Sequence, residues 1–339
     1  MAVSLLLGYT SLLWDGMITL TFTIGLFSLL GYILPLVYQW TPAREENFKI
    51  KYGCSWAIVV GSIEGINAQV IHKLARQSIN VVIVSEADEE TSVFHKNIQT
   101  DYPNCQFRFI PVNFTSDVME SITSNTADIS ANVLIFNMSD INIGLFADIP
   151  ERDHVNTMRI NCECVLRVTH WFLNRYLKGK NNVDVDDVPL FSTGAIIYVS
   201  SPAGFSASPF ALTYGSTKAF LTHFSSSLAA EVRGEHLDVL TVHTSPTRAD
   251  SSSPETVGMS PIHRVCRFLV YSPEQVASVI FSRVGRFPFI YNQGYWPLLH
   301  RMLFKFVDDQ AFACIISWLV PYSNEYKRLL AVRMSEQGL

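Results

Sequence analysis

A tyrosine, a lysine and a serine are the residues of this sequence best placed to do chemistry. Tyr214 and Lys218 are four positions apart on an expected helix, so they share one face, a single turn apart. A phenol with a pKa of about 10 carries protons poorly at neutral pH, and an adjacent ammonium group stabilises the phenolate. Ser201, just after an expected strand, can donate a hydrogen bond to a carbonyl oxygen while Tyr214 delivers the proton. This set predicts interconversion of a carbonyl and an alcohol, with hydride from a nicotinamide cofactor.

A turn that contains two glycines follows the first expected strand and suits a dinucleotide. The turn comprises Gly61, Ser62, Ile63, Glu64, Gly65, Ile66 and Asn67, and leads directly into an expected helix. Glycines let backbone amides approach a pyrophosphate, and the helix N-terminus adds partial positive charge. Such a turn also occurs as an ordinary strand-to-helix connection, and the Tyr-x-x-x-Lys spacing also occurs by chance on helix edges. The combination of both with Ser201 in one chain favours the functional interpretation.

Acidic residues after the second expected strand favour NAD(H) over NADP(H). Glu86 and Asp88 follow Ser85 at the point where a 2'-phosphate would need a cation. A carboxylate would instead accept hydrogen bonds from a free ribose hydroxyl. The alternative, that Glu86 simply faces solvent, stays open.

Short β-branched runs alternate with longer helical segments between Tyr52 and about Thr244, which predicts a parallel sheet with helices on both faces. The expected strands are Ser55 to Val60, Asn80 to Val84, Phe107 to Val112, Asn132 to Phe136, Gly194 to Val199 and Leu237 to Val242. The expected helices are Gly65 to Gln77, Glu89 to Thr100, His154 to Leu177 and Leu212 to Val232. Ser272, followed by Pro273, predicts the start of a further helix. The fold class is α/β, a Rossmann-type doubly wound parallel sheet in a single domain.

An apolar segment near the N-terminus predicts a transmembrane anchor. Met17 to Tyr38 holds no charged residue, and at about 1.5 Å per residue it can cross a hydrocarbon core of roughly 30 Å. A cleaved signal peptide is the alternative, but the first fourteen residues hold no Lys or Arg. Basic residues begin only at Arg44, which places the following domain on the cytosolic side by the positive-inside rule. We expect the membrane to be that of the endoplasmic reticulum.

The chain therefore divides into an anchor at 1–43 with a transmembrane helix at about 17–38, a nucleotide-binding domain at 51–290 and a helical extension at 291–339. A loop at about 245–272 is expected to shape the substrate pocket. Within the extension, Ala311 to Tyr322 is too short to span a membrane, so it would either lie in the membrane interface or pack as a C-terminal helix. The formal charge of -5 argues against a nucleic-acid partner, and the six cysteines have no spacing that frames a metal site.

These motifs resemble those of the short-chain dehydrogenases/reductases, and within them the membrane-bound 17-beta-hydroxysteroid dehydrogenase and very-long-chain 3-oxoacyl-CoA reductase branch. The resemblance runs from about Lys51 to Arg283. The matching stretches are Tyr52-Gly53-Cys54-Ser55-Trp56-Ala57 before the glycine turn, Val199-Ser200-Ser201, and Tyr214-Gly215-Ser216-Thr217-Lys218-Ala219-Phe220. An N-terminal membrane helix also suits that branch.

The resemblance implies roles for further residues. Asn161 matches the fourth active-site residue of the family, which holds a proton-relay water near the lysine. Pro246 and Ser251 fall where the family contacts the nicotinamide carboxamide. The family also implies a homodimer through the two helices expected at 154–177 and 212–232.

Four positions depart from the family's pattern. Val60 replaces the usual Thr before the first glycine, and Asn67 replaces the third glycine. Asn113 replaces the Asp that contacts adenine, and Asn137-Met138-Ser139 replaces an Asn-Ala-Gly-like run. We expect these changes to weaken the cofactor site and to leave the chemistry intact. Asn67 adds a side chain where the helix must pack closely, whereas Asn113 can still hydrogen-bond adenine.

Two functions fit these residues. The first is an oxidoreductase acting on a lipid, such as a steroid or a 3-oxoacyl thioester, with Asn161, Ser201, Tyr214 and Lys218 as its active site. The second is a non-catalytic relative that binds a lipid or a protein partner at the membrane, which the altered nucleotide motifs suggest. Drift normally removes catalytic groups once the chemistry is lost, and all four remain, so the enzyme is favoured. The sequence leaves the substrate and the direction of the reaction open.

Overall fold

The computed structural model describes residues 2–39, 41–180, 194–245, 271–306 and 308–336. The chain divides into two compact units, Met1–Ala43 and Arg44–Leu339. The first unit contains a single long helix, α1 (Ala2–Gln39). Within α1, Leu13–Gln39 is long and apolar enough to cross a membrane, by length and composition. The apolar segment expected at Met17 to Tyr38 lies inside this stretch.

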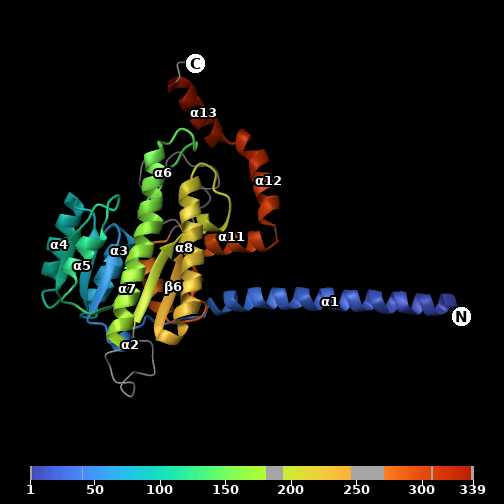
Figure 1. Cartoon of the computed structure of the whole chain (residues 1–339), viewed down its shortest axis with the longest axis horizontal. Helices are drawn as coiled ribbons and strands as arrows, with labels where there is room; N and C mark the ends of the chain where they lie inside the picture. Colours follow the sequence, from blue (N-terminus) through green and yellow to red (C-terminus); the bar gives the residue numbers. More distant parts are fainter. Residues whose placement is uncertain (1, 40, 181–193, 246–270, 307, 337–339) are drawn as a thin grey trace. The chain divides into compact units, whose positions relative to one another are not determined.

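One parallel sheet of seven strands forms the centre of the described part of the second unit (Figure 1). The strands are β1 (Trp56–Val60), β2 (Asn80–Ser85), β3 (Phe107–Pro111), β4 (Ala131–Phe136), β5 (Gly194–Ser200), β6 (Leu237–His243) and β7 (Ile290–Asn292). Their order is β3-β2-β1-β4-β5-β6-β7, so the chain reverses its direction of travel across the sheet between β1 and β4. In doubly wound sheets, ligands bind at the carboxyl ends of the strands beside that reversal. The predicted Rossmann-type fold is confirmed.

Helices cover both faces of the sheet and continue beyond it. They are α2 (Phe48–Tyr52), α3 (Ile66–Arg76), α4 (Glu89–Asp101), α5 (Met119–Asn125), α6 (Glu151–Met158), α7 (Cys164–Lys180), α8 (Leu212–Glu231), α10 (Pro273–Arg283), α11 (Tyr295–Phe306), α12 (Asp309–Leu319) and α13 (Asn324–Glu336). Three shorter segments matter below: the π-helical turn η1 (Arg159–Glu163), and the 3-10 turns η3 (Pro202–Phe205) and η8 (Val320–Tyr322). Apolar side chains of α3 and α10 pack on one face, and those of α5, α7 and α8 on the other.

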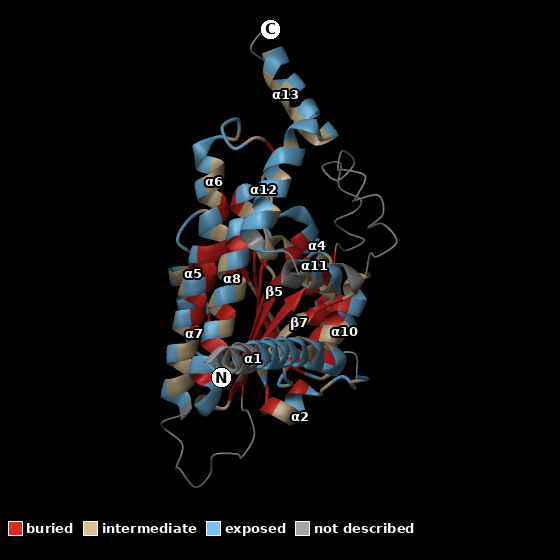
Figure 2. Cartoon of the chain, turned by 90° about the vertical axis from the view of Figure 1, so that its right-hand side faces the viewer, coloured by how far each residue is buried: buried red, intermediate tan, exposed pale blue. Residues whose placement is uncertain are grey.

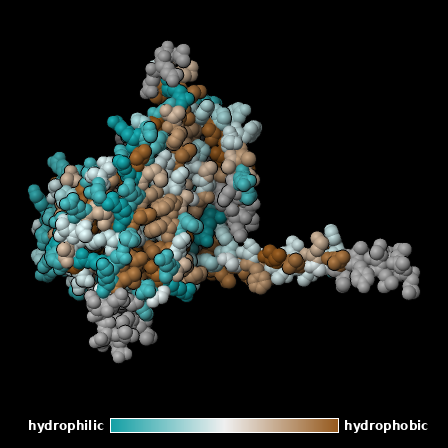
Figure 3. Space-filling view, viewed as in Figure 1, coloured by the Kyte–Doolittle hydropathy of each residue, from teal (hydrophilic) through white to brown (hydrophobic). Residues whose placement is uncertain are grey.

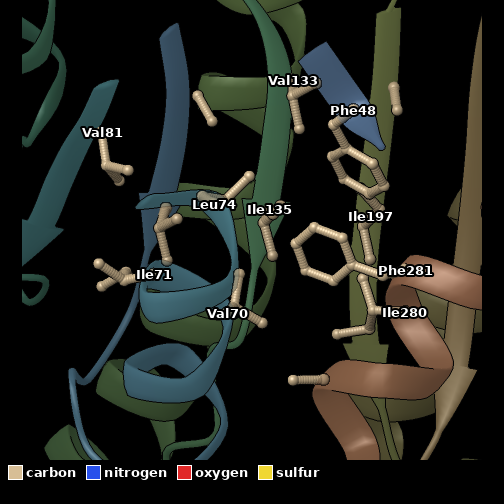
Figure 4. Close-up of a cluster of buried hydrophobic side chains, with 14 of the residues drawn as sticks. Phe48, Val70, Ile71, Leu74, Val81, Val133, Ile135, Ile197, Ile280 and Phe281 are labelled. Carbon is tan, nitrogen blue, oxygen red and sulfur yellow. The ribbon is translucent and has the colours of Figure 1, made fainter. Parts of the chain in front are cut away.

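The alternation of strand side chains builds the two halves of the core. Val59 of β1 joins the cluster on the α3 and α10 side, whereas its neighbours Ile58 and Val60 join the cluster on the α7 and α8 side. Figure 2 shows the strands as buried almost throughout. In Figure 4, Phe48 of α2 faces Phe281 of α10, and their stacked rings have centroids 4.3 Å apart. Burying one such side chain stabilises the fold by about 1.5 to 3 kcal/mol.

The six expected strands are each confirmed to within about one residue at either end. The sequence analysis missed β7, because a strand of three residues is too short to show alternation. The helix expected at 154–177 is confirmed as one helical segment over 151–180, formed by α6, the π turn η1 and α7 in succession. The predicted start at Ser272 is confirmed, since its side chain accepts a hydrogen bond from the Gln275 amide in a capping box. Most of the expected substrate loop, and with it Pro246 and Ser251, lies outside the described residues.

Candidate active site

Tyr214 and Lys218 lie one turn apart near the start of α8, as their spacing predicts. The Lys218 Nζ is 5.3 Å from the centroid of the Tyr214 ring. Tyr214 is half-buried, while Lys218 is only 2% exposed. The hydroxyl of Thr217, between them in sequence, donates to the Tyr214 carbonyl oxygen over 2.7 Å. The ammonium group can therefore act on the phenol through a short and largely water-free path.

Lys218 reaches across to the end of the neighbouring strand β4. Its Nζ donates a 2.6 Å hydrogen bond to the carbonyl oxygen of Met138, two residues beyond that strand. Burial lowers the pKa of Lys218 to about 8, an effect that the nearby Cys162 thiol opposes. The amine is thus mainly charged at neutral pH, yet it releases a proton far more readily than a lysine in water.

Asn161 lies in the π-helical turn η1, where the wider i to i+5 spacing interrupts the long helix. Its Oδ1 accepts from the Asp140 amide at 3.0 Å, and its Nδ2 donates to the Asp140 carbonyl oxygen at 2.8 Å. The same Nδ2 also donates to Thr217 Oγ1 at 3.1 Å. The Asn161 amide therefore joins the loop after β4 to helix α8, and both of its polar atoms are satisfied by the chain itself.

Ser201 directly follows β5, and its hydroxyl accepts a hydrogen bond from the Ala203 amide at 3.3 Å. The turn η3 that follows lies against α8. A Cβ added at Gly204 would stand 2.6 Å from the Ala219 amide nitrogen, closer than any real Cβ contact. A glycine is thus required for the serine loop to approach the helix that carries Tyr214 and Lys218.

A buried chain of polar side chains lies behind the site. His243, at the end of β6, has its Nε2 at 3.0 Å from Thr222 Oγ1 and its Nδ1 at 3.1 Å from Asn292 Oδ1. Thr222 in turn donates to the Lys218 carbonyl oxygen at 2.8 Å. Burial lowers the pKa of His243 to about 4, so the imidazole is neutral at neutral pH. Sequence analysis missed these hydrogen-bonded side chains and the contact between Asp140 and Asn161, because no short-range pattern links residues so far apart in sequence.

The glycine turn after β1 requires its first glycine. Gly61 has φ of 123°, and an added Cβ would stand 2.2 Å from the Asn137 carbonyl oxygen. Asn137 itself follows β4, and its amide donates to the Val60 carbonyl oxygen at 3.0 Å. The carboxyl ends of β1 and β4 are therefore fastened together at the point where the strand order reverses, which is where a dinucleotide pyrophosphate binds in this type of sheet.

The first turn of α3 fits an anionic ligand. Gly65, with φ of 58°, precedes the helix and provides no side-chain cap for the amides that follow, beginning with Ile66. We expected Asn67 to crowd this turn, but the structure buries its side chain, and its Nδ2 donates to the Ser62 carbonyl oxygen at 2.7 Å. Asn67 thus fastens the turn from inside. The residues present fit a dinucleotide.

Carboxylates gather beside this turn, at the expected ribose position. The pKa of Glu64 is raised, first by a hydrogen bond with the Glu90 carboxyl group and then by partial burial. Asp88 caps α4 by accepting from the Thr91 amide at 2.6 Å, and this bond lowers its pKa. Glu86 is exposed next to them. This edge of the site therefore carries several carboxylates.

Asn113, expected at the adenine, is exposed after β3, and its Oδ1 accepts from the Thr115 amide at 2.9 Å. The structure places it at the same end of the sheet as the glycine turn. Among the described residues, no group of three or more His, Cys, Asp and Glu side chains is placed to hold a metal ion.

Comparison with known proteins identifies the family of this chain. Residues 55–257, more than half of the chain, match the sequence model of the family described as short chain dehydrogenase. The chain belongs to the short-chain dehydrogenase/reductase family. It is an oxidoreductase of that family, and the glycine turn, the serine after β5 and the Tyr-x-x-x-Lys helix all fall within the matched region.

Curated relatives include enzymes that act on steroids and on acyl-CoA thioesters. The 7beta-hydroxysteroid dehydrogenase of Collinsella aerofaciens is 23% identical over 241 residues, which cover 71% of this chain and 86% of that protein. The very-long-chain 3-oxoacyl-CoA reductase of Podospora anserina is 25% identical, over 76% of this chain and 72% of that protein. The same type of reductase from Schizosaccharomyces pombe is 28% identical, over 63% of this chain and 65% of that protein.

Solved structures confirm the fold. A structure of 7beta-hydroxysteroid dehydrogenase superposes with a TM-score of 0.64 at 22% identity, and covers 77% of this chain and 95% of that one. An actinorhodin polyketide ketoreductase solved with NADPH gives a TM-score of 0.55 at 16% identity, and covers 68% of this chain and 89% of that one. The long N-terminal apolar helix precedes the region that matches the family model.

Proposed function

We propose that this chain is an NAD(H)-dependent oxidoreductase that interconverts a ketone and a secondary alcohol on a lipid substrate held at a membrane. The observation that carries the proposal is that Lys218 and Asn161 both hydrogen-bond the loop after β4, with the Tyr214 ring beside Lys218. The Ser201 loop packs on the same helix as Tyr214. This cluster lies at the carboxyl ends of the strands, beside the glycine turn. Family members of known structure, including a ketoreductase solved with NADPH, share the fold that supports it.

In the reductive direction, Tyr214 donates its phenolic proton to the substrate oxygen while Ser201 holds that oxygen with a hydrogen bond. When bound, the nicotinamide supplies the hydride. Lys218 stabilises the phenolate that remains, because its ammonium group is close to the ring and poorly solvated. The side-chain amide of Asn161 is held by Asp140 and Thr217, and by its resemblance to the fourth active-site residue of the family Asn161 would hold a relay water near Lys218.

The cofactor would be held by Gly61, Ser62, Glu64, Gly65 and Ile66 of the turn, by Asn113 and Asn137, by Tyr214 and Lys218, and by Pro246 and Ser251. The preference for NAD(H) rests on the carboxylates of Glu86, Glu64 and Asp88 at the ribose edge. Glu64 already shares a hydrogen bond with the Glu90 carboxyl group, and its raised pKa reflects that crowding of negative charge. A further phosphate dianion would add to the repulsion.

A lipid ketone is the substrate class that the relatives and the anchor together support. The relatives are named for a steroid and for a very-long-chain 3-oxoacyl-CoA, both bulky and largely apolar. The Leu13–Gln39 stretch of α1 would hold the enzyme at the membrane in which such molecules dissolve. We propose that this membrane is the endoplasmic reticulum, with the catalytic domain in the cytosol.

Direct binding of NADH and NADPH to the full chain in detergent, measured by calorimetry, tests the function. We expect a dissociation constant in the micromolar range for NADH, weaker binding of NADPH, and NADH-dependent reduction of steroid or 3-oxoacyl ketones. If neither nucleotide binds at millimolar concentration, the chain is a non-catalytic relative that binds a lipid or a protein partner.

The side of the membrane can be tested with sequons that the chain already carries. Asn113-Phe114-Thr115 is an acceptor sequence for N-glycosylation, and Asn113 is exposed. A domain in the lumen would be glycosylated there, and removal of the glycan would shift its mobility on a gel. We expect no shift when the protein is expressed in a eukaryotic cell, and a shift would reverse the proposed orientation.

We also propose that the enzyme is a homodimer that pairs through the outer faces of α7 and α8. Hydrophobic side chains gather over these helices in Figure 3, and a groove of about 740 Å³ runs between them and α6. It is lined by residues that include Met158, Leu166, Leu212 and Phe220. Leu166 and Leu212 are 45% and 53% exposed. Pairing would remove this apolar surface from water. Analytical ultracentrifugation should show a dimer that Leu166→Arg converts to a monomer, while Val93→Arg, at a similarly exposed apolar residue on α4, should not.

A further inference from the structure

Helix α12 displays an apolar stripe to solvent. The helix is exposed over most of its surface, and the exposed apolar residues on one side of α12 and η8 are three and four positions apart. They are Ala311, Cys314, Ile315, Trp318, Leu319 and Tyr322. Trp318 and Tyr322 are 69% and 67% exposed. No charged residue occurs from Gln310 to Ser323. Figure 2 shows α12 as mostly exposed. Such a stripe on a soluble surface calls for a partner.

The helices before and after α12 both contact the domain. Before it, His300 of α11 places its Nε2 at 3.3 Å from Ser206 Oγ, and its ring lies 6.0 Å from the ring of Phe205. After it, Arg333 of α13 forms a salt bridge of 2.6 Å with Asp148. Helices α11 and α13, on either side of α12 in sequence, therefore both contact the domain.

Both attachment points belong to loops beside the candidate active site. Phe205 and Ser206 lie in and just after η3, which begins one residue after Ser201. Asp148 lies in the segment between β4 and α6, and that segment also contains Asp140, the hydrogen-bond partner of Asn161. The C-terminal helices therefore connect the two loops that flank the catalytic residues.

We propose that α12 lies in the boundary between headgroups and acyl chains of a lipid bilayer, with Ile315 and Trp318 directed into the lipid. A helix of eleven residues is about 16 Å long, too short to span. An uncharged stripe that ends in Trp and Tyr suits this boundary, because each ring combines an apolar body with a polar tip. The chain already carries a helix apolar enough to cross a bilayer, and this inference rests on that proposed anchor.

The anchor makes the bilayer the partner that α12 meets first. Only residues 40–47 separate α1 from α2, and eight residues reach at most about 30 Å. The domain thus stays within reach of the membrane, where even modest surface affinity is enough for binding. A second copy of the chain suits the stripe less well, since a stable dimer buries about 800 Å² per partner and one side of so short a helix provides far less. Docking of α12 would bring both active-site loops next to the lipid that carries the substrate.

The test uses the full chain in phosphatidylcholine nanodiscs, with nitroxide labels and power-saturation electron paramagnetic resonance. In a Cys266→Ser, Cys314→Ser background, the four remaining cysteines are buried. A label at Ile315→Cys should be relaxed more by oxygen, which concentrates in lipid, than by a water-soluble nickel chelate. Ala313→Cys, exposed on the opposite side of α12, is the matched control. A label there should be relaxed more by the nickel chelate than by oxygen, so its ratio of oxygen to nickel relaxation should be several-fold lower than at Ile315.

A third label, at Phe27→Cys of α1, separates this inference from the anchor. Lipid exposure at Phe27 with water exposure at Ile315 would refute the inference and keep the anchor. Water exposure at Phe27 with lipid exposure at Ile315 would refute the anchor and keep the inference about α12. Water exposure at both positions would refute the anchor and the inference. Shielding of Ile315 from oxygen and nickel alike would show that protein covers the stripe, which also refutes the inference.

Discussion

The Lys218 ammonium group donates a 2.6 Å hydrogen bond to the Met138 carbonyl oxygen, and so connects helix α8 to the carboxyl end of β4. The adjacent residue, Asn137, hydrogen-bonds through its amide to Val60 at the end of β1. The proton-transfer helix and the glycine turn are thus linked through two consecutive residues. Rigid positioning of this kind matters, because small displacements of catalytic groups cost large factors in rate.

Replacement of Tyr214 by Phe should abolish turnover and leave the fold intact, since only a hydroxyl group is removed. We expect kcat to fall by about 10²- to 10⁴-fold or more, the usual contribution of a positioned general acid. The NADH dissociation constant should change little. Steady-state kinetics together with calorimetry will separate the two effects.

Tyr176→Phe is the matched control for that substitution. The Tyr176 hydroxyl donates to the His236 carbonyl oxygen at 3.0 Å, far from the Lys218 cluster. Its loss should lower stability by roughly 1 kcal/mol without reducing kcat. Retained activity in Tyr214→Phe would refute the proposed proton donor.

Gly61→Ala should collapse the nucleotide turn. The new methyl group would stand 2.2 Å from the Asn137 carbonyl oxygen, so β1 and β4 would have to separate at their carboxyl ends. We expect NADH affinity to fall by at least about tenfold, since the backbone amides lose their alignment. Isothermal calorimetry measures this directly.

Gly53→Ala provides the comparison for Gly61→Ala. Gly53 also has a positive φ, 60°, but nothing lies within 4 Å of an added Cβ. That substitution should cost about 1 to 2 kcal/mol in backbone strain and leave NADH affinity unchanged. Equal losses of affinity in both variants would show that a positive φ, and not the close approach to Asn137, controls the turn.

The sequence predicted the parts of this molecule that depend on local patterns. Six strands follow from short β-branched runs between helical segments, and the Tyr214 to Lys218 face follows from a four-residue spacing on a helix. The role of Asn67 could not be predicted, because its contact with the Ser62 carbonyl oxygen depends on how the turn closes under the helix. The same holds for the hydrogen bonds between Asp140 and Asn161, and for those that connect Thr222, His243 and Asn292. They join elements that are far apart in sequence, and only the fold brings these elements together.

Glu86→Arg should move cofactor preference towards NADP(H). A guanidinium group at the exposed edge after β2 can pair with a 2'-phosphate, and the substitution also removes one of several clustered carboxylates. A charge-assisted hydrogen bond contributes about 1.5 to 3 kcal/mol, so the ratio of NADPH to NADH affinity should rise at least about tenfold. Glu120→Arg makes the same charge change at an exposed position on α5 and should leave the ratio unchanged. An unaltered ratio in Glu86→Arg would remove Glu86 from the site.

His243 should make the enzyme sensitive to acid. Burial lowers its pKa from 6.5 to about 4, and the Arg301 charge adds to this while the Asn292 hydrogen bond opposes it. Between these two values the unfolded chain binds more protons than the folded one, so the free energy of unfolding falls as the pH drops through this window. The full shift corresponds to about 3 kcal/mol, and most of it is lost by about pH 4.5.

The acid sensitivity can be isolated by comparing variants. His243→Gln keeps a polar side chain but cannot take up the proton, so it should lose less stability than the wild type between neutral pH and pH 4.5. At roughly 2 to 4 °C per kcal/mol, the difference in Tm change should be about 5 to 10 °C. His223→Gln, at an exposed position on the same helix as Thr222, should behave like the wild type. A wild-type Tm that falls no further than that of His243→Gln would show that the buried imidazole is already compensated by its surroundings.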